Sequence, residues 1–124
     1  QKQWAKNKYL VLSYSSKIYL EIRTYLKQEE VSLEKVNKLI KQAINLPEDK
    51  GQVTNALHHV WGYFKKFATK EEKDNFFEMI EDYHINKTTK EDLIEEVKKL
   101  LEKYPNTYLE QSTFINGGKD ETLA

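Results

Sequence analysis

The sequence has no cysteine among its 124 residues. That absence excludes disulfides, thiolate metal sites and cysteine nucleophiles, and it excludes an iron–sulfur cluster held by this chain. Proline and glycine are scarce as well, with two and four residues respectively. Pro47 and Pro105 both fall between segments of helical periodicity, where proline ends a helix. Pro105 also suits the first position of a short final turn.

The sequence also lacks long apolar runs and a net charge. No apolar run approaches the roughly 20 residues that cross a bilayer, and no signal-peptide pattern opens the chain. We therefore expect a cytoplasmic protein with no membrane contact. Lys and Arg together number 20, as do Asp and Glu, so the formal net charge is zero. This balance disfavours a uniformly basic nucleic-acid binder but is compatible with a local basic patch.

What the sequence does contain is helical periodicity. Apolar residues recur on one face of six segments, at about 4–12, 18–26, 33–44, 53–67, 76–83 and 93–104. No stretch of strand length alternates with period two. The pattern predicts an all-α fold, a compact bundle of six to seven short helices. We assign residues 1–115 to one helical domain and the polar residues 116–124 to a flexible C-terminal tail.

Several helix starts are marked by side chains that accept hydrogen bonds from the first turn. Ser32 is a candidate N-cap for the third segment. Thr69 and Glu72 have the spacing of a capping box before the fifth segment, and Thr88 repeats this pattern with Glu91 before the sixth.

The sequence encodes no recognisable catalytic or metal site. His58 and His59 are adjacent, so on a helix their side chains point about 100° apart, and His84 is distant in sequence. Without a His-x-x-x-His spacing we expect no metal and no cofactor. No Gly-x-Ser-x-Gly elbow is present either, so catalytic residues remain unknown.

The fourth segment has two different faces. Its apolar face carries the residues expected in the core: Val53, Ala56, Leu57, Val60, Phe64 and Phe67. Its opposite face carries Asn55, His59, Gly62 and Lys66, with Tyr63 at the edge. A glycine inside a helix costs about 1 kcal/mol relative to alanine, so we expect a helix or a ligand to approach the backbone at Gly62. Either a second helix buries Asn55 and His59, or the stripe faces a ligand beside Lys65.

Basic and aromatic residues interleave near the N-terminus, in the set Trp4, Lys6, Lys8, Tyr9, Tyr14, Lys17 and Tyr19. This composition suits phosphate pairing and base stacking on single-stranded nucleic acid, although tyrosine also fills ordinary cores. Lys8 shares a face with Val11 and Leu12. It either extends its ammonium to water or marks an anion-binding position beside an aromatic ring.

Two segments resemble a known family. One is Trp4-Ala-Lys-Asn-Lys8-Tyr-Leu-Val-Leu12, followed by Tyr19; the other is Asn55-Ala-Leu-His-His59-Val-Trp-Gly62-Tyr63-Phe64-Lys65-Lys66. They are similar to the opening and the central signature of the YbgA-like domains, and the resemblance extends to about Phe114. Such domains occur alone or fused behind a cysteine-rich desulfidase domain that removes sulfur from thiouracil-type bases. The resemblance implies an accessory, RNA-engaging half of a 4-thiouridine desulfidase acting on transfer RNA.

These observations favour a non-catalytic nucleic-acid-binding accessory domain, with transfer RNA and a separate desulfidase domain as expected partners. The candidate nucleic-acid-binding residues are Lys6, Lys8, Tyr19, Asn55, His59, Tyr63, Lys65 and Lys66. One alternative is a small enzyme acting on a nucleotide-like substrate with His59 as general acid or base. The other alternative is a protein-interaction module.

Overall fold

Residues 2–117 of the computed structural model fold into helices, and these residues contain no strand. The helices are α1 (Lys2–Tyr14), α2 (Ser16–Tyr25), α3 (Leu33–Ile44), α4 (Lys50–Trp61), α5 (Lys70–His84), α6 (Lys90–Lys103), α7 (Thr107–Glu110) and α8 (Thr113–Asn116). The predicted all-α class is confirmed. Within the described residues the short C-terminal segment forms two four-residue helices where one final turn was expected.

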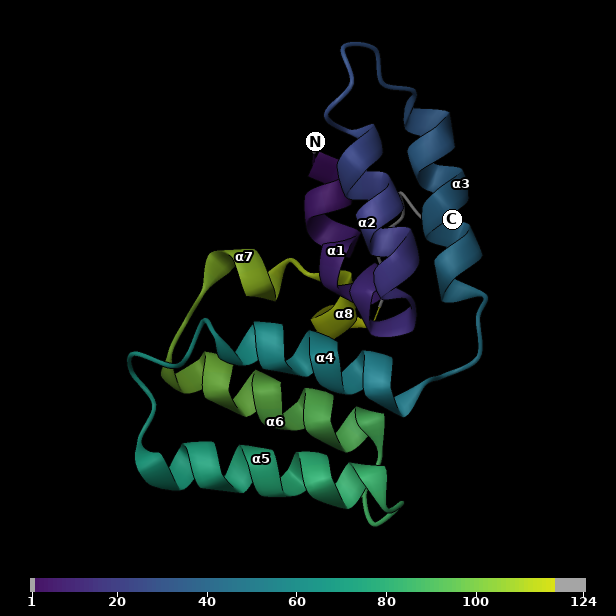
Figure 1. Cartoon of the computed structure of the whole chain (residues 1–124). Coiled ribbons are helices and arrows are strands. Elements are labelled where there is room, and N and C mark those ends of the chain that lie inside the picture. Colours follow the sequence, from purple (N-terminus) through teal and green to yellow (C-terminus); the bar gives the residue numbers. More distant parts are fainter. Residues whose placement is uncertain (1, 118–124) are drawn as a thin grey trace.

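The helices form two groups that share α1. In Figure 1, α4, α5 and α6 lie side by side across the lower part of the molecule, and α1, α2 and α3 stand upright above them. One buried cluster lies between α1, α2 and α3. A larger cluster joins α4, α5 and α6 to α1, α7 and α8. We call these the upper core and the lower core; α1 contributes Val11 to the first and Tyr9 and Leu12 to the second.

The helix starts follow local side-chain chemistry. The Ser32 hydroxyl accepts a hydrogen bond from the Lys35 amide at 3.3 Å, which confirms the predicted N-cap of α3. The capping box of α5 is also confirmed, because the Glu72 amide donates to Thr69 Oγ1 at 3.1 Å and the Thr69 amide donates to Glu72 Oε1 at 2.8 Å. Each side chain thus satisfies an amide that has no partner within the helix.

Two predicted helix starts are wrong by one or two positions. The N-cap of α6 is Thr89, whose hydroxyl accepts from the Asp92 amide at 3.1 Å, so the expected box from Thr88 is absent. Thr88 instead donates its hydroxyl hydrogen to Asp92 Oδ2 at 2.8 Å. Pro105 precedes the N-cap of α7, which is Asn106, and does not occupy the first helical position.

The fourth helix ends earlier than its periodicity predicts. After Trp61 the chain tightens, with the amides of residues 62–64 bonded to carbonyls three residues back, as in a 3₁₀ turn. Phe64 stays in the lower core at 1% exposed, but Phe67 turns outward and is 66% exposed. The expectation that Phe67 belongs to the core is therefore wrong, and Trp61 fills space in the core instead. Leu33, the first apolar residue of the segment predicted at 33–44, is also exposed.

A buried hydrogen bond joins α8 to α1. Asn7 is fully buried on α1, and its Oδ1 accepts from the Thr113 hydroxyl at 2.6 Å. The Asn7 amide group donates to the Gln3 carbonyl at 2.9 Å, so both ends of the side chain are used. The tail expected at residues 116–124 lies outside the described residues from residue 118 onward, and Asn116 ends α8.

Candidate nucleic-acid interface

The outer face of α4 is the first part of the candidate interface. Asn55 and His59 lie one turn apart, and both side chains are exposed. The adjacent His58 points elsewhere: its ring meets that of Phe77 on α5 edge-on, with centroids 5.2 Å apart and planes at 90°. No described helix covers Asn55 and His59, so the interpretation that a second helix buries them is wrong.

Gly62 has a simpler role than expected. It is the residue that caps α4 at its C-terminal end, with φ −52° and ψ −26°, an ordinary right-handed conformation. A Cβ atom at this position would lie 3.1 Å from the carbonyl oxygen of His59, which belongs to the same turn. No other described helix comes within 4 Å of this Cβ position, so the predicted close approach of a second helix to Gly62 is wrong. The glycine accommodates the tightened end of α4.

Three tyrosines from distant parts of the chain form a cluster at this end of α4. Tyr9 lies on α1, Tyr63 on the turn after α4 and Tyr108 on α7. The hydroxyls of Tyr9 and Tyr63 share a hydrogen bond at 2.8 Å. The Tyr9 ring meets the other two edge-on, at 6.0 and 6.3 Å between centroids, while the Tyr63 and Tyr108 rings stack at 5.9 Å. Tyr63 and Tyr108 remain half-exposed.

Burial keeps the hydroxyls of Tyr9 and Tyr108 neutral by raising their pKa. Burial raises the pKa of Tyr9, which is 5% exposed, and the hydrogen bond with Tyr63 raises it further. Burial also raises the pKa of Tyr108, with smaller contributions from Tyr63 and Tyr19. Phenols whose ordinary pKa is near 10 therefore stay protonated at neutral pH. They can donate and accept hydrogen bonds but do not act as bases.

Tyr19, Trp4 and Lys8 extend the cluster onto α1 and α2. The rings of Trp4 and Tyr19 lie 5.6 Å apart at 46°, and Tyr19 packs against both cores. The Lys8 ammonium lies 5.5 Å from the centre of the Tyr9 ring, a distance within the range of a cation–π contact. Lys8 is half-buried. We call Tyr9, Tyr19, Tyr63 and Tyr108 the tyrosine cluster.

The structure brings some of the predicted site residues together and separates others. Lys8, Tyr19 and Tyr63 meet at the tyrosine cluster, Asn55 and His59 precede it on α4, and Lys65 and Lys66 are exposed on the turns that follow it. Lys6 is half-buried on α1. At 100° per residue it points about 200° away from Lys8, so these two lysines do not share a face.

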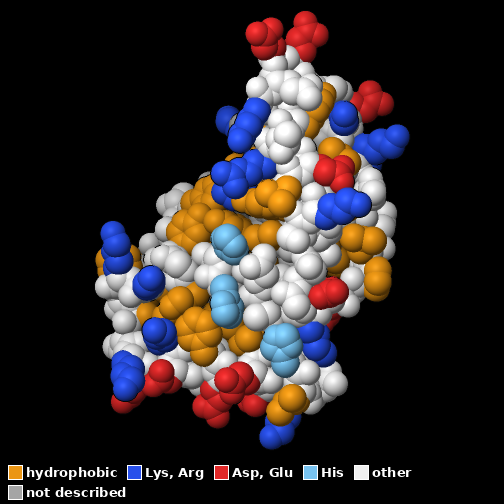
Figure 2. All heavy atoms as spheres, in the orientation of Figure 1, with side chains coloured by type: hydrophobic (Ala, Val, Ile, Leu, Met, Phe, Trp, Pro, Cys, Tyr) orange, Lys and Arg blue, Asp and Glu red, His pale blue; other side chains and the backbone are white. Residues whose placement is uncertain are grey.

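Figure 2 shows this part of the surface. Hydrophobic side chains gather where α7 and the upper helices meet α4, with histidine directly beside them and Lys or Arg side chains above. The sequence did not indicate Tyr108 as a site residue, and Tyr9 was noted only among the interleaved basic and aromatic residues near the N-terminus. Tyr108 lies within the resemblance, which extends to about Phe114, but no local pattern relates it to residues 45 or more positions away.

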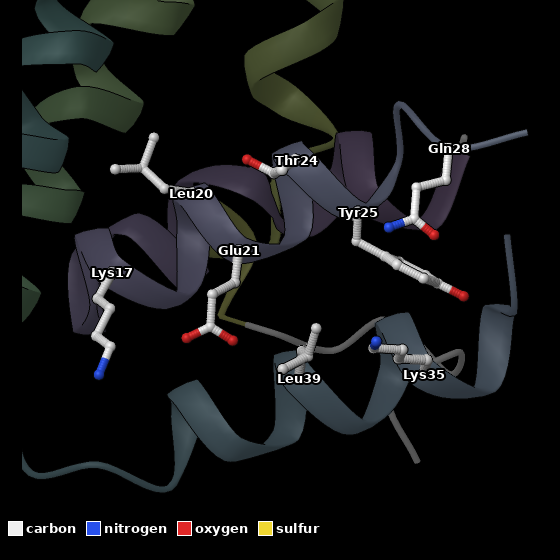
Figure 3. A pocket seen from close by; sticks show the side chains of 8 residues that line it. All are labelled: Lys17, Leu20, Glu21, Thr24, Tyr25, Gln28, Lys35 and Leu39. Atoms are coloured by element: carbon white, nitrogen blue, oxygen red, sulfur yellow. The ribbon is translucent and has the colours of Figure 1, made fainter.

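Two hollows of the structure lie along α3, away from the candidate interface. A groove of about 490 Å³ runs between α2 and α3, with Lys17, Glu21 and Lys35 on its walls and none of the predicted site residues (Figure 3). Among residues 2–117, no group of three or more His, Asp or Glu side chains is arranged to hold a metal ion. None of the helices described is long and apolar enough to cross a membrane.

Comparison with protein families shows which family the chain belongs to. A family model described as "Protein of unknown function (DUF1722)" matches residues 8–117. The chain belongs to this family, the YbgA-like domains. The matched region of the YbgA-like domain runs from Lys8 to the end of α8, so it includes both cores and the whole tyrosine cluster. Neither a curated protein nor a solved structure matches the chain.

Proposed function

We propose that this YbgA-like domain is a non-catalytic accessory domain that binds RNA, with transfer RNA as its ligand. The observation that carries the proposal is the grouping of Lys8 and the half-exposed rings of Tyr19, Tyr63 and Tyr108 at one end of α4. A flat ring offers a stacking surface to any unpaired base, and a nearby ammonium pairs with phosphate. Because the net charge of the chain is zero, attraction to phosphate has to come from lysines gathered locally at such a site.

Each residue has a proposed role. Tyr19 and Tyr63 stack on bases, and the exposed side chains of Asn55 and His59 hydrogen-bond to the RNA along α4. The phosphates pair with Lys8 at one end of this surface and with Lys65 and Lys66 at the other; Lys6 lies on a different face of α1 and is left out of this contact. Lys65 and Lys66 are exposed, and neither is in a salt bridge within residues 2–117.

The proposed partner is a separate desulfidase domain that removes the thio group from 4-thiouridine. This part of the proposal rests on the resemblance of the Trp4–Leu12 and Asn55–Lys66 segments to fused members of the family. With no cysteine in the chain, iron–sulfur chemistry would come from the partner. The YbgA-like domain would then present cytoplasmic transfer RNA to it.

A catalytic role for His59 has less support. A histidine that acts as general acid or base is normally oriented by a second group on its other ring nitrogen. Within residues 2–117 the His59 ring has no hydrogen-bond partner, and its side chain is exposed. The histidine that does make such a contact is His84, whose Nε2 lies 2.8 Å from Thr54 Oγ1.

Titration of labelled transfer RNA by fluorescence anisotropy at several salt concentrations tests the proposal. Log K should fall with log salt by about 0.7 to 0.9 for each phosphate contact. Lys8→Gln and Lys66→Gln should each reduce that slope by about one contact. Lys41→Gln is the matched control, because Lys41 is an exposed lysine on α3 outside the candidate interface. Absence of binding at low salt would overturn the proposal and favour a protein-interaction module.

A further inference from the structure

The Phe67 side chain is unusually exposed for a phenylalanine. It is 66% exposed, more than any other large hydrophobic side chain described as exposed, and the others lie in different segments: Leu20, Val31, Leu33, Leu46 and Ile85. Within the described residues, no other large exposed hydrophobic lies within 17 positions of Phe67 in the sequence, and its near neighbours in the chain include lysines at 65, 66 and 70. Docking surfaces for proteins usually present a contiguous apolar centre with few charges, so a ring among lysines is a poor match to one.

The Phe67 ring is backed by a second aromatic ring. It stacks on Tyr104 at the end of α6, with centroids 6.3 Å apart and planes at 22°. The Tyr104 hydroxyl donates to Glu72 Oε1 at 2.6 Å. The Glu72 carboxylate is itself fixed by the α5 capping box and by Lys103, whose ammonium lies 3.1 Å from Oε2. The two rings therefore form a preorganised platform with one open face on Phe67.

The chain around the platform is locally basic. Residues 65–73 contain four lysines and two glutamates, and one of the two glutamates is already paired with Lys103. Lys65, Lys66 and Lys70 are exposed, and within residues 2–117 none of them is in a salt bridge. A flat exposed ring among unpaired lysines has the chemistry of a stacking site for a base with its flanking phosphates.

We propose that the Phe67–Tyr104 platform is a second RNA contact, at which one unpaired base stacks on the open face of Phe67. This inference rests on the proposed RNA binding and extends its path from Tyr63, four residues earlier, past Lys65 and Lys66. The RNA at this point is single-stranded, because a paired and stacked base has no free face for the ring.

The test compares single-stranded RNA with duplex RNA of the same sequence in anisotropy titrations. Phe67→Ala should weaken binding of the single strand by about 5- to 150-fold, the value of one base–aromatic stack, and should leave duplex binding unchanged. Phe67→Trp should retain binding, whereas Phe67→Leu, which is apolar but not flat, should lose it. Ile85→Ala is the matched control, because Ile85 is an equally exposed apolar residue, at 61%, beyond the end of α5.

A second readout reports on stacking directly. A 2-aminopurine base moved along the single strand should change its fluorescence at one position with the wild-type protein, and that change should vanish in Phe67→Ala. RNA binding that is equal for wild type and Phe67→Ala would overturn the platform and leave the proposed function standing. The same holds if Phe67→Ala weakens binding of the separate desulfidase and not of RNA, which would assign Phe67 to a protein contact. Absence of RNA binding by the wild type would overturn both proposals.

Discussion

The two cores of this domain are filled in different ways. Among residues 2–117, the buried side chains of the upper core are all aliphatic, with half-buried rings only at its edge; the buried residues are Val11, Ile18, Ile22, Val36, Ile40 and Ala43. The lower core contains buried rings on most of its helices, among them Tyr9, Trp61, Phe64, Phe76, Tyr83 and Phe114. Because aromatic side chains bury more area than aliphatic ones, the lower core should contribute more of the free energy of unfolding than the upper core. The helices α2 and α3 should open at a lower free energy than α4, α5 and α6.

This difference matters for the proposed RNA site, because the site lies where the two cores meet. Tyr19 packs against both cores, and Trp4, its ring partner, packs against the upper one. The rigid side of the site is therefore Tyr9 and Tyr63, and the side that can adjust is α2. RNA binding should slow the opening of α2 more than that of α5.

The largest expected effect is in the lower core. Phe64→Ala should lower the free energy of unfolding by about 3 to 5 kcal/mol, because Phe64 is 1% exposed and its loss leaves a cavity. His59→Ala, on the exposed face of α4, should change it by less than about 1 kcal/mol. Chemical denaturation of both variants measures the contrast. Similar losses for the two variants would show that the α4 stripe contributes to the core.

In the upper core the expected effect is smaller. Ile40→Ala should cost about 2 to 3 kcal/mol, at the lower end for a buried aliphatic residue, because α3 has neighbours on one side only and can shift to close the cavity. Amide hydrogen exchange should be faster in α3 than in α5 and α6 of the wild type, and faster still in Ile40→Ala. Slower exchange in α3 than in α5 would contradict the ranking of the two cores.

Loss of the buried hydrogen bond between α8 and α1 should lower the free energy of unfolding by less than loss of a buried core side chain. Thr113→Val removes the hydroxyl that donates to Asn7 Oδ1 while keeping the shape of the side chain. The buried amide oxygen is then left without this donor, which should cost about 1 to 3 kcal/mol. Thermal unfolding measures the loss, and Thr107→Val, at an exposed position of α7, is the control. A neutral Thr113→Val would mean that water or a shifted side chain replaces the hydroxyl.

The smallest effect should come from Glu72, and it should depend on pH. The hydrogen bonds from the Tyr104 hydroxyl and the Thr69 amide, with the nearby Lys103 ammonium, lower the pKa of Glu72 to about 2. A carboxyl with a lowered folded-state pKa stabilises the fold above its unfolded pKa, near 4.5, and loses this contribution as pH falls toward 2. Glu72→Gln should therefore be less stable than wild type at pH 7, and the difference should shrink between about pH 4.5 and 2. A difference that is constant over that range would rule out the carboxylate as its cause.

The sequence predicted some features that depend on neighbours in the chain, although it misplaced the starts of α6 and α7, and it missed those that depend on distant residues. Ser32 and the Thr69–Glu72 box were predictable because their partners lie three residues away. The end of α4 was not, because the periodic pattern continues to Phe67 while the chain turns out of the helix after Trp61. The tyrosine cluster joins residues 9, 63 and 108, and no local rule places them together. The sequence left two alternatives for His59, burial under a second helix or exposure toward a ligand, and only the structure distinguishes them.

The two cores that share α1 cannot form at the same time during translation. Val11 and the helices α2 and α3 leave the ribosome before α4 to α8, so the upper core can assemble as soon as residue 44 has emerged. Tyr9 and Leu12 must wait, because their neighbours in the lower core include residues as late as Phe114 and Ile115. At synthesis rates of about 5 to 20 residues per second, this leaves apolar side chains of α1 uncovered for several seconds. A nascent chain stalled before α8 should therefore bind chaperones, and one extended past it should not.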